Sequence, residues 1–169
     1  TKGGEDDAVS VAMRLIIHYV GDVHQPLHAT SRVDHEYPKG DFGGNTVKLP
    51  AKDGVTNLHA LWDSVSYEYS GYAKLPFTDS DWDLNGKRAQ DLVSKHPLSS
   101  LKADVTNLDP QQWADESLAV SESFVYKGVD AGKAVPSAYV PEAQSLAEER
   151  IVTAGYRLAN LIMKMTVPT

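Results

Sequence analysis

Two short stretches of this chain carry a histidine and an aspartate four residues apart. The first holds His18 and Asp22, and the second holds His59 and Asp63. Side chains four residues apart lie on the same face of an α-helix, so each pair is able to bind one ion. The sequence therefore predicts that both stretches are helical and that each pair is half of a metal site.

A third histidine follows the first pair closely. Pro26 lacks a backbone donor and should end the first helix at about its own position, which leaves His28 on the turn just beyond. An isolated pair of this kind is common as a surface pair or a satisfied buried pair on a helix. Two pairs near a further histidine, on apolar segments where an unpaired charge is costly, favour metal binding instead. The predicted ligands are His18, Asp22, His28, His59 and Asp63.

The donor types indicate the metal and its chemistry. The chain has no cysteine, so nitrogen and oxygen atoms must hold any ion. Zinc binds histidine and carboxylate groups, and a catalytic zinc site keeps one position for water. Asp22 lies between His18 and His28 in the sequence and is able to bridge two ions. Clustered divalent ions lower the pKa of a shared water and stabilise the attacking and leaving oxygens of a phosphoryl transfer, so the predicted substrate is a phosphate ester.

The remaining histidines and two of the tryptophans are weaker candidates. His24 lies off the helix face of the predicted ligands, so we expect it behind them or on the surface. His35 and His96 occupy loop-like or helix-end positions and are expected to be structural or exposed. Trp62 and Trp113 are expected in the hydrophobic core rather than as stacking surfaces.

Glycines and further aromatic residues flank the predicted ligands. Gly43 and Gly44 are either turn residues or positions where a flat base approaches the backbone. Stacking on one or two exposed rings would hold unpaired bases without reading their sequence. The aromatic candidates are Tyr37, Phe42, Tyr67, Tyr69 and Tyr72.

Length and composition are those of one globular domain without a linker. The chain has 169 residues, of which 41% are hydrophobic and 23% charged. Its net charge of −7 argues against nucleic-acid binding through a basic surface, although bound cations reverse the sign locally. No apolar run has the length of a bilayer span, and the start does not resemble a signal peptide. Because the chain starts in what reads as an exposed loop, we expect a cleaved piece of a longer protein.

Apolar spacing predicts a mostly helical chain with long loops. A helix is predicted over residues 7–24, and its stripe with Val11 and Leu15 should carry the first ligand pair into the interior. Residues 29–55 have loop composition, with a strand-like run at 45–49. Capping residues and prolines predict further helices from residue 57 to near Gly71, from 79 to 95, from Asp109-Pro110 to before Gly128, and from Pro141 onward.

Five motifs occur in a fixed order along residues 10–165. They are His18-x3-Asp22 with Gln25-Pro26-Leu27-His28, Gly43-Gly44-Asn45, Asn57-Leu58-His59-x2-Trp62-Asp63, and Trp113-Ala114-x-Glu116-Ser117. In this order and at these intervals the chain resembles the S1/P1 family of zinc-dependent nucleases. That family includes the plant class I nucleases and the trypanosomatid 3'-nucleotidase/nucleases.

The resemblance implies an all-α, phospholipase C/P1 nuclease-like fold with long loops and a three-zinc cluster at the bottom of a cleft. His18 and Asp22 would belong to the first ion, and Asp22, the implied catalytic residue, would also bridge to the third. The second ion would be held by His28, His59 and Asp63. An activated water would attack phosphorus while zinc stabilises the leaving 3'-oxygen. Single-stranded RNA and DNA would yield 5'-nucleotides, with a 3'-nucleotidase activity alongside.

The resemblance also implies which residues form a substrate pocket, and it implies that the N-terminal half of the nuclease domain is not part of this sequence. Gly43, Gly44 and Asn45 match a loop that helps to form the base pocket, which a paired base cannot enter. Family members begin with a tryptophan and further ligands that are not found here. Residues 1–169 therefore resemble the C-terminal portion of a single zinc nuclease domain, incomplete at the N-terminus, and an N-terminal half is the expected partner. The lack of cysteine departs from the plant members.

The sequence thus predicts part of a zinc nuclease that is secreted or on the cell surface, a location implied by the resemblance alone. Two alternatives remain at this point. A zinc phospholipase C-like enzyme would have a lipid-facing apolar rim. A non-catalytic metal-binding module would keep the ligands only to stiffen two helices.

Overall fold

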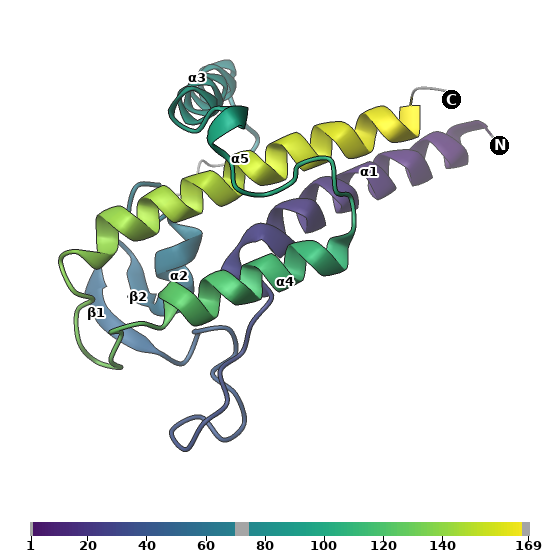
Figure 1. Cartoon of the computed structure of the whole chain (residues 1–169). Helices are drawn as coiled ribbons and strands as arrows, with labels where there is room; N and C mark the ends of the chain where they lie inside the picture. The colour runs from purple at the N-terminus through teal and green to yellow at the C-terminus, as the bar shows by residue number, and fades with distance from the viewer. Residues whose placement is uncertain (1, 70–74, 167–169) are drawn as a thin grey trace.

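The computed structural model describes residues 2–69 and 75–166, and the chain is mostly helical there (Figure 1). This confirms the all-α prediction. The α-helices are α1 (Lys2–His24), α2 (Leu58–Asp63), α3 (Asp79–Lys95), α4 (Pro110–Val120) and α5 (Tyr139–Thr166). Shorter elements are the 3-10 turns η1 (Pro26–His28) and η2 (Leu98–Ser100), the π-helical turn η3 (Ser121–Val125), and the antiparallel strands β1 (Lys48–Lys52) and β2 (Val55–Asn57).

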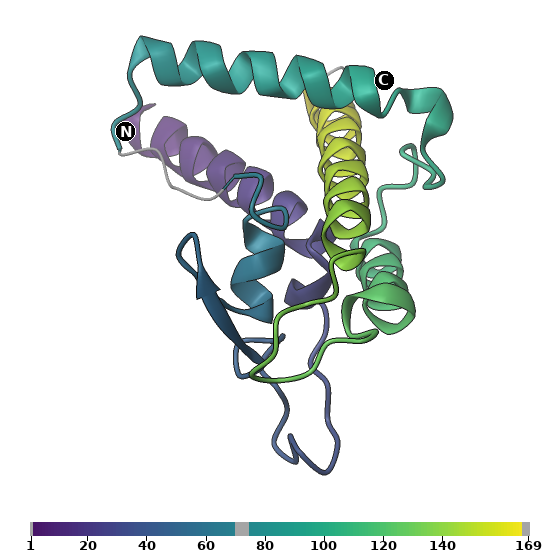
Figure 2. The same ribbon diagram turned by 90° about the vertical axis from the view of Figure 1, so that its left-hand side faces the viewer.

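Helices α4 and α5 both pack against α1, and these three helices form the main helical layer of the fold (Figure 1). Helix α3 lies across α5 (Figure 2). A capping box between Thr78 and Asp81 fixes the first turn of α3. The loop over residues 29–47 extends away from the helices before the two strands return the chain to α2. The end of α1, η1 and α2 therefore meet where the predicted ligands lie.

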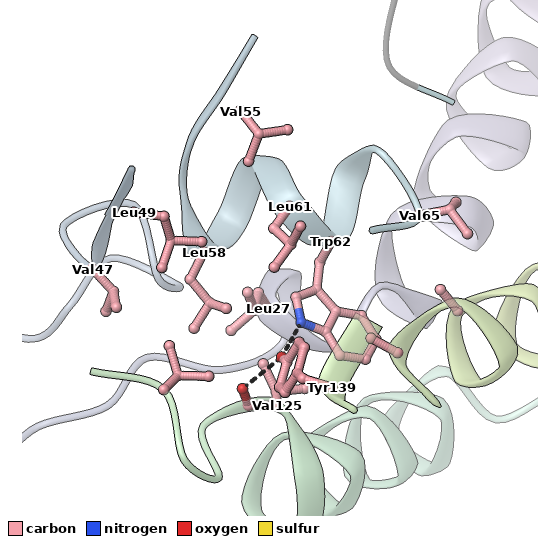
Figure 3. Close-up of a cluster of buried hydrophobic side chains, with 13 residues drawn as sticks. Leu27, Val47, Leu49, Val55, Leu58, Leu61, Trp62, Val65, Val125 and Tyr139 are labelled. Carbon is pink, nitrogen blue, oxygen red and sulfur yellow. Dashed lines mark hydrogen bonds between the residues drawn. The ribbon is translucent and has the colours of Figure 1, made fainter. Parts of the chain in front are cut away.

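The buried core joins α2 and the hairpin to η3 and the start of α5 (Figure 3). On α2 the buried residues are Leu58, Leu61 and Trp62, as the apolar spacing requires. The Trp62 indole N–H donates to the Tyr139 hydroxyl at 2.9 Å, and that hydroxyl donates to the Val125 carbonyl at 2.8 Å. This chain of bonds satisfies the polar ends of both rings and fixes the helix that carries His59 and Asp63.

Helix α1 differs from the prediction at its start and in its buried face. It begins at Lys2 rather than at residue 7. The stripe predicted to face the interior is exposed, since Val11 is 54% and Leu15 is 45% exposed. Helices α4 and α5 instead cover the side of α1 with Val20 and His24. Apolar residues on several sides of α1 made the buried face ambiguous in the sequence.

Helix α2 ends at Asp63, so the prediction of a helix reaching toward Gly71 is wrong. The cause is three consecutive left-handed residues, Val65, Ser66 and Tyr67, with φ of 49°, 52° and 77°. Local bonds stabilise this conformation: Ser66 N–H donates to the Leu61 carbonyl at 2.8 Å, and the side chain of Gln144 donates to the Ser66 carbonyl at 3.0 Å. The predicted break near Gly71 and the candidate Tyr72 lie outside the described residues.

The other predicted boundaries agree closely with the structure. Helix α3 spans the predicted residues 79–95, and α4 begins at Pro110 behind the Asp109 cap. Helix α5 begins at Tyr139, so Pro141 occupies its first turn. Part of the loop predicted at 29–55 is in fact strand β1, which overlaps the strand-like run at its end. Within the described ranges no helix is long and apolar enough to span a bilayer.

Candidate metal centre

The five predicted ligands form a row where α1, η1 and α2 meet. Asp22 lies between two histidines, with 3.2 Å from its Oδ2 to His18 Nε2 and 3.5 Å from its Oδ1 to His28 Nδ1. Asp63 likewise lies between His28 and His59, with 3.4 Å from Oδ1 to His28 Nε2 and 3.4 Å from Oδ2 to His59 Nε2. The two segments therefore bring all five side chains into one connected row.

Three of these residues form a compact ligand set. His28, His59 and Asp63 each offer one ligand atom, and these atoms lie within 4.8 Å of one another. The two imidazole rings stack at 5.0 Å between centroids, and all three side chains are partly buried. Two nitrogen donors and a carboxylate fit zinc. His18 is 65% exposed and joins this set through Asp22 rather than directly.

The tautomer of His59 suits metal binding. His59 Nδ1 lies 2.8 Å from the Gly43 carbonyl oxygen, which can only accept a hydrogen bond. Nδ1 therefore carries a proton, which leaves Nε2, 3.4 Å from Asp63 Oδ2, as the ring nitrogen that would bind an ion. Gly43 has a φ of +62°, and a Cβ built there would overlap the Leu27 carbonyl oxygen of η1. This position requires glycine for both reasons.

Asp63 and His28 shift each other's pKa. The hydrogen bond that His28 donates to Asp63 raises the pKa of His28 more than burial lowers it. Burial raises the pKa of Asp63, but hydrogen bonds from His28 and Gln25 outweigh burial and hold that pKa below its ordinary value. The carboxylate thus stays ionised, which is the form that binds a cation.

A buried ionic cluster lies behind the ligands and was not predicted as a unit. Arg157 is fully buried and donates to both carboxylate oxygens of Glu116, each at 2.7 Å. Arg150 donates to the same carboxylate at 2.9 Å. Burial raises the pKa of Glu116, but the bonds from the two arginines outweigh it and hold the pKa below its ordinary value. Glu116 belongs to a recognised motif, whereas the two arginines gave only the weak signal of sharing a helix face.

This cluster caps the end of α1. Arg150 Nε donates to the His24 carbonyl at 3.1 Å, and the Ser117 hydroxyl donates to the Val23 carbonyl at 2.6 Å. The last carbonyl groups of a helix lack partners within the helix, so α4 and α5 supply them here. The cluster thereby fixes the point where the chain leaves α1 toward His28.

His24 is part of this support and not a surface residue. It is 1% exposed, its Nδ1 donates to the Val20 carbonyl at 2.7 Å, and its Nε2 accepts from Arg157 at 2.9 Å. Burial lowers the pKa of His24 to about 4, with the nearby arginines acting in the same direction. Of the two positions predicted for His24, the one behind the ligands is observed.

Two cavities flank the ligand row. The larger, about 820 Å³, is lined by Asp22, His28 and His59 together with Tyr19, Phe42 and Gly43. The smaller, about 380 Å³, is also lined by Asp22 and His28, together with apolar residues that include Ile17, Ile151 and Leu158. Asp22 and His28 line both cavities, so these two side chains are accessible from each of them.

The predicted substrate residues occupy different positions around the larger cavity. Gly43 lines it. Gly44 is buried beneath, against Leu58 and the backbone of α2. Asn45 is exposed, and its side-chain amide donates to the Phe42 carbonyl at 2.9 Å. Their role in substrate binding stays a prediction.

The remaining candidates behave as structural residues. Trp62 and Trp113 are each 2% exposed, which confirms their prediction as core residues. His96 bonds to the Glu148 carboxylate at 2.9 Å, and His35 is exposed. Neither histidine belongs to the ligand row.

A sequence model of the S1/P1 nuclease family matches residues 1–166. The chain belongs to the S1/P1 nuclease family. Among similar proteins, Endonuclease 3 of Arabidopsis thaliana is 28% identical over 157 residues, covering 91% of this chain and 51% of that protein. Nuclease S1 of Aspergillus oryzae is 28% identical over 156 residues, covering 88% and 52%.

This S1/P1 chain spans about half the length of the curated relatives it matches. A third relative, Endonuclease 1 of A. thaliana, is 29% identical over 161 residues, and the match covers 49% of that protein. The match confirms the resemblance inferred from the five motifs. The ligand row, the glycine loop and Glu116 all lie within the matched residues.

Proposed function

We propose that this chain carries the second zinc site of a phosphodiesterase that hydrolyses single-stranded RNA and DNA to 5'-nucleotides and also acts on 3'-nucleotides. The observation that carries the proposal is the convergence of His28, His59 and Asp63 within 4.8 Å. Membership of a nuclease family supports the reaction class. The donor set, without sulfur, supports zinc as the cofactor.

The residues have distinct roles in this proposal. His28, His59 and Asp63 would hold one zinc ion, and His18 and Asp22 would contribute to a neighbouring one. Bound zinc would polarise a water molecule and a phosphate oxygen. Asp22 is the proposed catalytic residue because its two carboxylate oxygens face His18 and His28 and so link the two ligand groups. The Gly43 carbonyl keeps the His59 ring in the required tautomer.

The larger cavity is the proposed substrate side. Two aromatic residues that line it, Tyr19 and Phe42, are 61% and 64% exposed. Exposed rings next to phosphate chemistry suit unpaired bases, whose flat faces are free for stacking. Gly43, Gly44 and Asn45 would form the base pocket at this edge. Cations at the ligand row would offset the net charge of −7 for an anionic substrate.

We further propose that the rest of a nuclease domain completes the cluster and that residues 1–169 are its C-terminal portion. The exposed apolar side of α1 with Val11 and Leu15 supports a covering segment. The coverage of about half of each relative is consistent with it. Secretion or display at the cell surface remains part of this proposal.

One observation favours a second candidate, a zinc phospholipase C-like enzyme. The smaller cavity next to His28 is mainly apolar and would suit an acyl chain. The glycine loop and the exposed rings of Tyr19 and Phe42 at the larger cavity favour the nuclease. Zinc-loaded protein that includes the proposed N-terminal half, incubated with poly(A), 3'-AMP and phosphatidylcholine, distinguishes the two. Hydrolysis of the nucleotides is expected, and hydrolysis of phosphatidylcholine without poly(A) would overturn the nuclease proposal.

The variant Asp22→Ala separates catalysis from a purely structural metal module. We expect hydrolysis of poly(A) to be lost, while the helical circular dichroism spectrum and the melting temperature of the metal-free protein stay as in the wild type. Unfolding of Asp22→Ala, together with wild-type protein that includes the N-terminal half and binds zinc without hydrolysing any of the three substrates, would support the structural module instead.

A further inference from the structure

Gln25 connects the two segments that carry the ligand set. It is the first residue after α1, and its side-chain oxygen accepts a hydrogen bond from the Leu27 backbone N–H at the start of η1. Its side-chain nitrogen donates to Asp63 Oδ1 at 2.9 Å, across 38 positions in the sequence. One side chain therefore binds both the turn that carries His28 and the carboxylate at the end of α2.

The orientation of the Gln25 amide is determined by its partners. A backbone N–H can only donate, so the amide oxygen must face Leu27 and the amide nitrogen must face Asp63. An ionised carboxylate only accepts, which matches this arrangement. The contact restricts rotation of the Asp63 carboxylate while its second oxygen faces His59.

The turn η1 has other attachments and does not depend on Gln25 alone. The Pro26 carbonyl accepts from the Thr30 hydroxyl at 2.9 Å and from the Ser121 hydroxyl at 3.1 Å. Leu27 is buried in the core. Loss of the Gln25 side chain would therefore leave η1 packed in place while it releases the Asp63 carboxylate.

We propose that Gln25 is a positioning residue that holds the Asp63 carboxylate toward His28 and His59 for metal binding. The inference rests on the proposed zinc site. Hydrogen bonds to ligating groups orient them, and their removal typically lowers metal affinity about 10–100-fold. The proposed function assigns roles to the five ligand residues but gives no role to Gln25, so this inference adds a sixth residue to the site.

The test is the zinc affinity of the full 169-residue chain at fixed pH, measured by competition with a chromophoric chelator. Gln25→Leu removes both amide contacts at similar size, and we expect zinc to bind about 10–100-fold more weakly. Thr30→Val is the matched control, because it removes a bond to η1 but leaves the Gln25–Asp63 contact. Gln90→Leu makes the same substitution on the exposed surface of α3. Both controls should bind zinc like the wild type.

A second readout separates positioning from loosened packing. The visible absorption of bound cobalt reports ligand geometry, and we expect it to change in Gln25→Leu but not in Thr30→Val. Equal zinc affinity and an unchanged cobalt spectrum in Gln25→Leu would overturn the inference. Equal weakening by Thr30→Val would also overturn it, since the effect would then belong to η1 as a whole.

The failures of the two proposals are distinguishable. Wild-type chain that binds no zinc would overturn the proposed metal site and this inference together. Wild-type chain that binds zinc, while Gln25→Leu binds zinc equally well and gives an unchanged cobalt spectrum, would overturn this inference alone. Should Gln25→Leu melt too low to be titrated, Gln25→Met, which keeps the unbranched shape without the amide, carries the same comparison.

Discussion

Replacing Gly43 with alanine should damage both the fold and the metal site, whereas the same change at Gly54 should not reach the metal site. Both glycines have left-handed backbone, with φ of +62° at Gly43 and +82° at Gly54. A Cβ at Gly54 would meet nothing within 4 Å, whereas one at Gly43 would overlap the Leu27 carbonyl oxygen. Gly54→Ala therefore measures backbone strain alone, and Gly43→Ala adds a clash with a backbone atom.

The expected magnitudes follow from these two terms. Left-handed backbone costs a residue with a Cβ about 1–2 kcal/mol, so Gly54→Ala should lower the free energy of unfolding by that amount. Overpacking adds about 1–3 kcal/mol, so Gly43→Ala should cost about 2–5 kcal/mol. A shift of the loop that relieves the clash would disturb the contact between the Gly43 carbonyl and His59 Nδ1, which lies 2.8 Å from it. We therefore expect zinc affinity to fall about 10-fold or more in Gly43→Ala.

Urea unfolding followed by circular dichroism gives the stability of both variants, and chelator competition gives their zinc affinity. The reasoning requires Gly43→Ala to be the less stable of the two and the only one with weakened zinc binding. Equal stability losses together with wild-type zinc affinity in both variants would refute it.

Three further predictions concern the buried cluster and the metal. Glu116→Gln leaves two buried arginines without their charge partner and should cost about 3–5 kcal/mol in urea unfolding, whereas Asp130→Asn at an exposed pair should cost less than about 0.5 kcal/mol. The pKa of Glu116 in the folded protein lies below its ordinary value of 4.5, so the stabilisation by the Glu116 carboxylate is complete above pH 4.5 and is lost as the pH falls through the folded pKa. Glu116→Gln should therefore lose stability less steeply than the wild type below pH 4.5 in an acid titration. An identical slope would contradict this. Zinc at 100 times its dissociation constant should raise wild-type stability by about 2.7 kcal/mol, and a chelator should reverse the gain, with no such response in Asp63→Asn.

The ligand row was predictable because local geometry determines most of it. Residues four apart on a helix are neighbours wherever the helix packs, so the pairing of His59 with Asp63 needed no tertiary information. The proline after α1 placed His28 on a turn, as observed. Helix starts at strong caps, such as Asp109 before α4, were likewise predictable.

Features set by distant contacts were not predictable from the sequence. The early end of α2 depends on three left-handed residues without glycine, a conformation that local preference disfavours and that tertiary contacts such as Gln144 stabilise. The support of α1 by Arg150 and Arg157 joins residues more than a hundred positions apart. The sequence indicated that Gly43 is a turn residue or a base-contact position. Its close approach to the Leu27 carbonyl of η1 could not be predicted, because that contact depends on how the loop folds back onto η1.

The most direct test of the account is anomalous diffraction at the zinc edge from crystals of this chain grown with zinc. The account predicts a zinc peak within about 2.0–2.2 Å of ligand atoms from His28, His59 and Asp63. A zinc ion bound elsewhere, with these three side chains contacting one another and no metal between them, would contradict it.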